Sequence, residues 1–116
     1  MGAVASLLKN KEQLVEAGQR IQDRLEAMRV TGESGGGAVR ATVTGKFGVV
    51  SIEMGGAVTS GLGADDQSRE MAQALIVEAV NDAIERAKRA TQELIAEEAR
   101  NLGVPELADK LGGLLT

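Results

Sequence analysis

The feature that most constrains the fold is a glycine-punctuated stretch at residues 29–54, which lies between two long segments of helical periodicity. In its middle part, Val39, Ala41 and Val43 alternate with polar residues, and this period of two is typical of a half-buried strand. Glycine-rich turns divide the stretch into three strand-like runs. The sequence therefore predicts an α+β fold in which a three-stranded antiparallel meander, at about residues 29–54, connects two long helices.

The glycine clusters do not match nucleotide-binding motifs. A Walker A loop ends in Gly-Lys-Ser/Thr, whereas Gly45-Lys46 is followed by Phe47. The triple glycine at residues 35–37 does not match the dinucleotide-binding fingerprint either. We expect these glycines to form hairpin turns that need positive φ, and the glycines between residues 55 and 63 to lie in a loop before the second helix.

The first helix is predicted at about residues 6–28 from a repeat in which every seventh residue is apolar, a spacing typical of a helix that packs against another helix. The repeat consists of Leu7, Leu14, Ile21 and Met28, with Gly18 and Leu25 at the intermediate positions. A glycine inside a helix costs up to about 1 kcal/mol relative to alanine. We therefore expect Gly18 to allow a close approach by the backbone of the partner helix.

The second long helix is predicted at about residues 65–100. Asp65 and Asp66 suit its amino terminus, because carboxylates there cap free amides and interact favourably with the helix dipole. A narrow, mostly alanine stripe follows the helix and consists of Ile76, Val80, Ala83, Ala87, Ala90 and Leu94. Since alanine permits close packing, we expect the two long helices to form an antiparallel pair folded back across the meander.

A short amphipathic tail follows this domain of residues 1–103. Pro105 suits the first position of a helix, and four leucines between residues 107 and 115 give the segment an apolar side. We expect residues 104–116 to form a short C-terminal helix, which either clasps its own protomer or contacts another one and builds a higher assembly.

Composition favours association and excludes several kinds of chemistry. Hydrophobic residues make up 43% of the chain, but many are alanine and the only aromatic residue is Phe47. Such a chain buries little apolar surface alone, so we expect an obligate homodimer. The chain has no cysteine or histidine, and helix-end and solvated-face roles explain the paired carboxylates at 65–66 and 97–98. We expect no enzyme activity, cofactor, metal site or small-molecule substrate.

The sequence has no apolar run long enough to cross a membrane. Its first residues lack the basic region and the longer apolar run of a secretory signal. We therefore expect a cytoplasmic protein with no membrane partner.

Two groups of basic residues are candidate contacts for an anionic partner. On a wheel of about 100° per residue, Lys9, Arg20 and Arg24 fall on one flank of the first helix, which is either an ordinary solvated face or a binding strip. The second group consists of Arg86, Lys88 and Arg89.

These two groups differ in how near their carboxylates lie. Most carboxylates of the first helix occupy its other faces, so Lys9, Arg20 and Arg24 are expected to be less neutralised. In the second helix, Asp82 precedes Arg86 by four residues, and Glu85 stands four residues before Arg89. Intrahelical ion pairs could therefore neutralise both of those arginines.

Three segments resemble the YbaB/EbfC family of bacterial nucleoid-associated proteins. They are VTGESGGGAV at residues 30–39, VVSIEM at 49–54 and VNDA at 80–83. With the preceding heptad helix, the resemblance covers roughly residues 7–100. The longer loop at residues 55–64 and the C-terminal tail depart from the family pattern.

The resemblance implies an α-β-β-β-α protomer and a homodimer whose sheets associate, with the long helices projecting like tweezers. It also implies binding of duplex DNA with little sequence specificity, organisation or compaction of the nucleoid, and effects on gene expression. The DNA-binding residues would be Lys9, Arg20 and Arg24, with Arg86, Lys88 and Arg89 as secondary contacts.

Charge is the observation that opposes DNA binding. The formal net charge is −4, and residues 65–116 carry six Lys/Arg against eleven Asp/Glu. DNA binding by such a chain would rest on phosphate contacts of weak and salt-sensitive affinity. The alternative is an acidic dimeric scaffold that binds other proteins through its helices or leucine tail and does not bind DNA directly.

Overall fold

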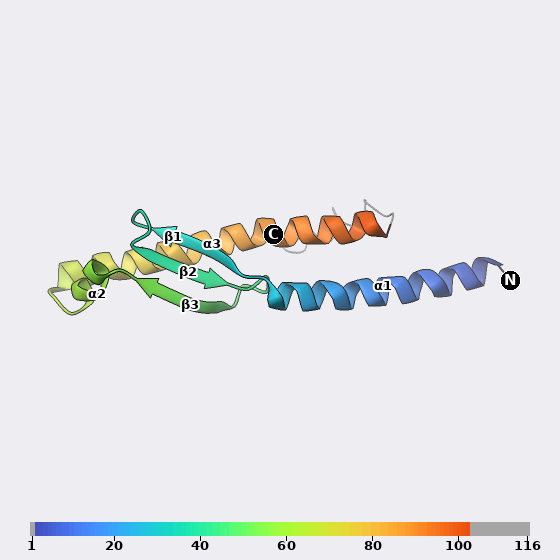
Figure 1. The fold of residues 1–116 in the computed structure, drawn as a ribbon, viewed down its shortest axis with the longest axis horizontal. Helices are drawn as coiled ribbons and strands as arrows, with labels where there is room; N and C mark the ends of the chain where they lie inside the picture. Colours follow the sequence, from blue (N-terminus) through green and yellow to red (C-terminus); the bar gives the residue numbers. More distant parts are fainter. Residues whose placement is uncertain (1, 103–116) are drawn as a thin grey trace.

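The computed structural model describes residues 2–102, with side chains from residue 11 onward, so the predicted tail at 104–116 lies outside the described residues. The elements in chain order are α1 (Gly2–Ala27), β1 (Val30–Ser34), β2 (Val39–Val43), β3 (Val49–Met54), α2 (Gly56–Leu62) and α3 (Asp66–Asn101). The predicted order of helix, three-stranded meander and long helix is confirmed (Figure 1). Asp65 caps α3 as expected, because its carboxylate accepts a hydrogen bond from the amide of Ser68.

The expectation of a loop between β3 and the long helix is wrong. Residues Gly56–Leu62 form the short helix α2, which packs against α3 at one end of the molecule (Figure 1). Val58 supplies the reason, since it is only 6% exposed and belongs to the same core as Ala72 of α3. Burying this valine requires the segment to turn back onto α3, and a helix satisfies its backbone there.

The sheet is an antiparallel meander in the order β1-β2-β3. Gly35, Gly36 and Gly37 have φ angles of 59°, 67° and 94°, which confirms the turn predicted for the first hairpin. In the second hairpin the residue with positive φ is Phe47, at 67°, and not a glycine as expected. Its turn is held by Thr44, whose hydroxyl accepts hydrogen bonds from two amides of the turn.

The core lies between α3 and the inner face of β1 and β2. Val39, Ala41 and Val43 of β2 are fully buried, as their alternation predicted. The buried residues of α3 form a stripe that includes Ala72, Ala79, Ala83, Ala87, Thr91 and Leu94. The alanine stripe expected to face the other helix therefore faces the sheet instead, over most of its length.

The close backbone approach occurs at Gly32 of β1 and not at Gly18. A Cβ atom at Gly32 would lie 2.1 Å from the backbone nitrogen of Ala83, whereas one at Gly18 would meet nothing within 4 Å. The expectation for Gly18 is wrong for the described protomer, because Gly18 lies on an exposed side of α1, next to the buried Ala17.

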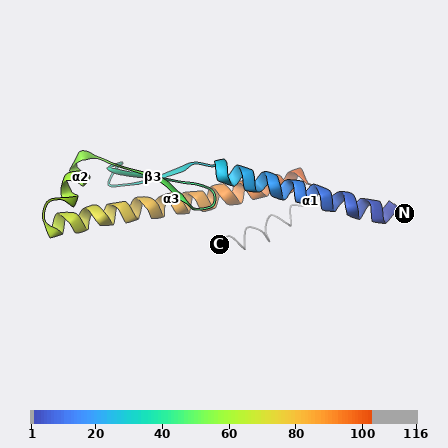
Figure 2. The same ribbon diagram turned by 90° about the horizontal axis from the view of Figure 1, so that it is seen from below.

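The two long helices run antiparallel and lie side by side beyond the sheet (Figures 1 and 2). Leu25 of α1 packs there against Leu94 and Ile95 of α3. The amino-terminal part of α1 projects past the end of α3, and Leu14 and Val15 are 47% and 66% exposed. The predicted helix pair is thus confirmed where Leu25 packs on α3, while Leu14, a member of the heptad repeat, is half exposed.

The edge strand β3 leaves an apolar row uncovered. Val49, Val50, Ile52 and Met54 are each 40–50% exposed, because α3 covers β1 and β2 but stops short of this edge. Ile52 pairs with buried Ala41, so it shares the inner face of the sheet. The neighbouring residue Ser51 therefore points to the opposite, polar face.

We predict opposite effects for alanine at Gly32 and at Gly18. Gly32→Ala should lower the free energy of unfolding by at least about 1–3 kcal/mol, because its methyl group overlaps the α3 backbone. Gly18→Ala should raise it by up to about 1 kcal/mol, since the exposed helix position has free space. Chemical denaturation monitored by circular dichroism measures both, and a neutral Gly32→Ala would contradict the close contact.

Candidate nucleic-acid interface

Arg20 and Arg24 lie one helical turn apart on α1 and reach across to the last turns of α3. The Arg20 guanidinium lies 3.3 Å from one carboxylate oxygen of Glu98, and the Arg24 guanidinium lies 3.3 Å from the other. The two arginine side chains are 50% and 45% exposed. They are thus fixed at their inner side and open to solvent at their outer side.

Glu98 is buried, which sequence reasoning missed when it placed this carboxylate on a solvated face. The residue is 4% exposed, and both of its oxygens are occupied by arginines. Removing the partners of a buried charge typically costs about 3–5 kcal/mol. The sequence signal was the spacing Leu94, Ile95 and Glu98, which places the carboxylate on the same buried side of α3.

Glu97 is the solvent-facing neighbour of this cluster. Its carboxylate lies 3.4 Å from Arg24, and its side chain is 51% exposed. Exposed pairs of this kind contribute only about 0–1 kcal/mol. The expectation that Arg20 and Arg24 are less neutralised is therefore wrong, because α3 supplies the carboxylates that α1 keeps on its other faces.

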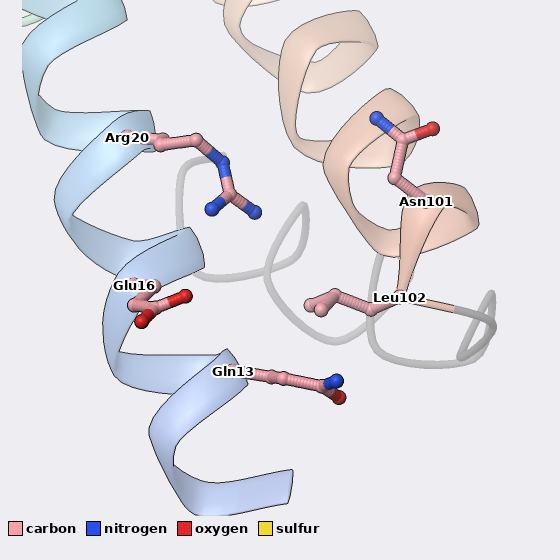
Figure 3. Close-up of a pocket in the computed structure, with 5 residues that line it drawn as sticks. All are labelled: Gln13, Glu16, Arg20, Asn101 and Leu102. Atoms are coloured by element: carbon pink, nitrogen blue, oxygen red, sulfur yellow. The ribbon is translucent and has the colours of Figure 1, made fainter. Parts of the chain in front are cut away.

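An open cleft of about 320 Å³ continues this contact toward the tip of the helix pair. It is lined by Gln13, Glu16 and Arg20 of α1 and by Asn101 and Leu102. Figure 3 shows Gln13 and Arg20 pointing from α1 toward the end of α3, with Leu102 pointing back. The lining mixes one cation with one carboxylate and two amides, which suits hydrogen bonding to a polar surface. Lys9 lies further along α1, and its side chain is outside the described residues.

The second group does not lie on a single face of α3: Arg86 and Arg89 are about 60° apart around the helix, and Lys88 lies elsewhere. Arg86 and Lys88 are two residues apart, which separates them by about 160° around the helix. Arg86 pairs with Asp82 as expected, at 3.1 Å, whereas Glu85 pairs with Lys88 rather than Arg89. Within residues 11–102, Arg89 has no carboxylate in ion-pair distance.

Asp82 has a structural role that limits the availability of Arg86. Its carboxylate accepts a hydrogen bond of 2.9 Å from the amide of Glu33 in β1. This bond, with a further contribution from Arg86, holds the pKa of Asp82 below its ordinary value. Arg86 therefore pairs with a carboxylate that also connects α3 to β1.

Other basic side chains, which the sequence did not single out, are also paired. Lys46 of the second hairpin lies 2.8 Å from Glu26, whose pKa it lowers by hydrogen bonding and charge. Arg40 faces Glu33 across the two strands at 3.7 Å. Most described cations thus have a carboxylate neighbour, so the surface carries few isolated positive charges.

Over the part of the chain that the structure describes, no three of the His, Cys, Asp and Glu side chains are grouped to hold a metal ion. No helix there is long and apolar enough to cross a membrane.

Both the sequence and the fold of the chain are similar to those of known proteins. Residues 1–102 match the model of a family described as the YbaB/EbfC DNA-binding family. The fold is also similar to the crystal structure of the uncharacterized protein HP0035 from Helicobacter pylori, at 18% sequence identity and a TM-score of 0.59. That match covers 81% of this chain and 90% of the other, and at such identity it concerns the fold.

We predict that Arg20→Ala with Arg24→Ala lowers the free energy of unfolding by about 3–5 kcal/mol, because it leaves Glu98 buried and unpaired. Adding Glu98→Gln to this double variant should restore a large part of that stability. Denaturant titrations of the three proteins measure the coupling. Equal stability of the double and triple variants would contradict a buried charge cluster.

Proposed function

The chain belongs to the YbaB/EbfC DNA-binding family, which is non-enzymatic, and from this we propose that it binds duplex DNA with little sequence specificity. We further propose that it acts on the nucleoid, which it organises or compacts, and that it thereby affects gene expression. The family match over residues 1–102 is the single observation that carries this proposal.

The arginines at the helix pair support phosphate contact. Arg20 and Arg24 are held side by side with half-exposed guanidinium groups, and guanidinium donors match phosphate oxygens. Phosphate contacts carry no direct sequence information, which fits low specificity. Phe47 is the only aromatic residue of the chain. Base stacking on a platform of several aromatic side chains is therefore not available to it.

We propose Arg20 and Arg24 as the principal contacts, together with Lys9, and Arg86, Lys88 and Arg89 as secondary ones. The first group is preferred because its two arginines converge on one carboxylate, Glu98, whereas Arg86 and Lys88 each pair with a separate carboxylate of α3. Arg89, which has no carboxylate partner within residues 11–102, is the member of that group best placed to contribute.

A homodimer is the second part of the proposal. The uncovered row of Val49, Val50, Ile52 and Met54 lies beside the unpaired backbone of an edge strand. Exposed apolar edge strands are rare in monomers, because they invite pairing with another chain. Association through β3 would cover this row and place two helix pairs on one assembly.

We predict that unrelated duplexes bind with similar affinity and that log affinity falls with log salt. Arg20→Ala with Arg24→Ala should reduce this slope by about 0.9 for each phosphate that the variant no longer neutralises. The pair is tested in a Glu98→Gln background, compared with Glu98→Gln alone, so that no buried carboxylate is left unpaired. Fluorescence anisotropy over a salt series gives the slopes.

The matched comparison is Arg86→Ala with Arg89→Ala, which should reduce the slope less. An unchanged slope in the Arg20 and Arg24 variant would reject the assigned surface. No binding by the parent protein at low salt would reject DNA binding itself and leave the acidic scaffold as the function.

For the dimer, sedimentation at micromolar concentration should give twice the mass of the 12.0 kDa chain. Ile52→Lys should produce a folded monomer, because it places a charge in the proposed apolar contact. Ser51→Lys is the control, since it adds the same charge to the opposite face of β3. A monodisperse monomer for the parent protein would refute the dimer.

A further inference from the structure

Adjacent carboxylates at the end of α3 contact the same arginine from very different environments. Glu97 and Glu98 both lie within 3.4 Å of the Arg24 guanidinium. The Glu98 side chain is 6% exposed, and that of Glu97 is 51% exposed. The same chemical group therefore meets Arg24 once in the protein interior and once at its surface.

Burial decides which of these contacts an incoming phosphate can replace. Displacing Arg20 or Arg24 from Glu98 would leave one oxygen of a buried carboxylate without its hydrogen-bond donor, which is unfavourable. Displacing Arg24 from Glu97 only returns an exposed carboxylate to water. A phosphate presents the same kind of oxygen acceptors as the carboxylate that it replaces.

We propose that Glu97 and Glu98 act in opposite directions on nucleic-acid affinity. Glu97 is a built-in competitor that occupies Arg24 until a phosphate of the duplex displaces it. Glu98 is a positioning residue that holds Arg20 and Arg24 together for phosphate contact. This inference rests on the proposed function and adds a determinant of its affinity.

The competition by Glu97 can be tested by removing its negative charge, which abolishes its ion pair with Arg24. Glu97→Gln should bind duplex DNA about twofold to fivefold more tightly than a charge-matched control, the range that corresponds to an exposed ion pair. The control is Glu93→Gln, which removes the same negative charge about one turn earlier on α3. Glu93 is exposed and is in no ion pair within residues 11–102.

The extra affinity must depend on Arg24 if competition is its cause. In an Arg24→Ala background, Glu97→Gln should therefore gain no more than Glu93→Gln, as a double-mutant cycle measures. Arg20 remains there to pair with Glu98, so this background does not leave the buried carboxylate without a cation. An equal gain in both backgrounds would show a general charge effect and overturn the competitor.

Glu98 should respond in the opposite sense. Glu98→Gln removes one negative charge, as the other two variants do. It should nevertheless bind DNA more weakly than Glu93→Gln, because the guanidinium groups of Arg20 and Arg24 lose their fixed positions. Glu98→Asp keeps the charge and should stay closer to the parent affinity. Tighter binding by Glu98→Gln than by Glu93→Gln would overturn the positioning role.

The measurement is fluorescence anisotropy with one mixed-sequence duplex at low and at physiological salt, with circular dichroism to verify each fold. Failure of the parent and all variants to bind rejects the proposed function and this inference with it. Binding by the parent with identical gains for Glu97→Gln and Glu93→Gln rejects only the competition.

Discussion

The contact on which the rest of the structure depends is the close approach of α3 to β1 at Gly32. The chain has almost no large aromatic side chains, so its core is built from alanine and valine and must be thin. A thin core requires the helix backbone to lie directly on the sheet, and only a residue without a Cβ fits opposite Ala83. The neighbouring bond from the Glu33 amide to Asp82 fixes the register of this contact.

That contact also determines what is left uncovered. A single helix seated on β1 and β2 does not cover β3, whose apolar row remains at the edge. The same helix is much longer than the sheet, so its last turns extend to the antiparallel α1 (Figure 1). Leu25 and Glu98 close this second contact, one by apolar packing and one by charge. The uncovered edge and the helix pair are thus both consequences of how α3 packs on the sheet.

Local sequence signals predicted the elements, and their partners were harder to predict. The alternation at Val39, the glycine turn at residues 35–37 and the Asp65 cap each act within a few residues, and each is found as predicted. The face of α3 was assigned to the wrong partner because an alanine stripe packs equally well on a helix or a sheet. The environment of Glu98 depends on residues more than seventy positions away, which no local pattern records.

An acidic chain can contact DNA when its charges are arranged locally, and this arrangement has a consequence for affinity. Within residues 11–102 most cations already have a carboxylate neighbour, so a phosphate gains little from attraction to the whole protein. Each proposed contact of Arg20 and Arg24 must instead share a guanidinium with the buried Glu98 or replace the exposed Glu97. The gain for each phosphate is then a difference between two similar interactions, and it is small. Useful affinity would require several such contacts at once, which an assembly of two or more protomers along a duplex would provide.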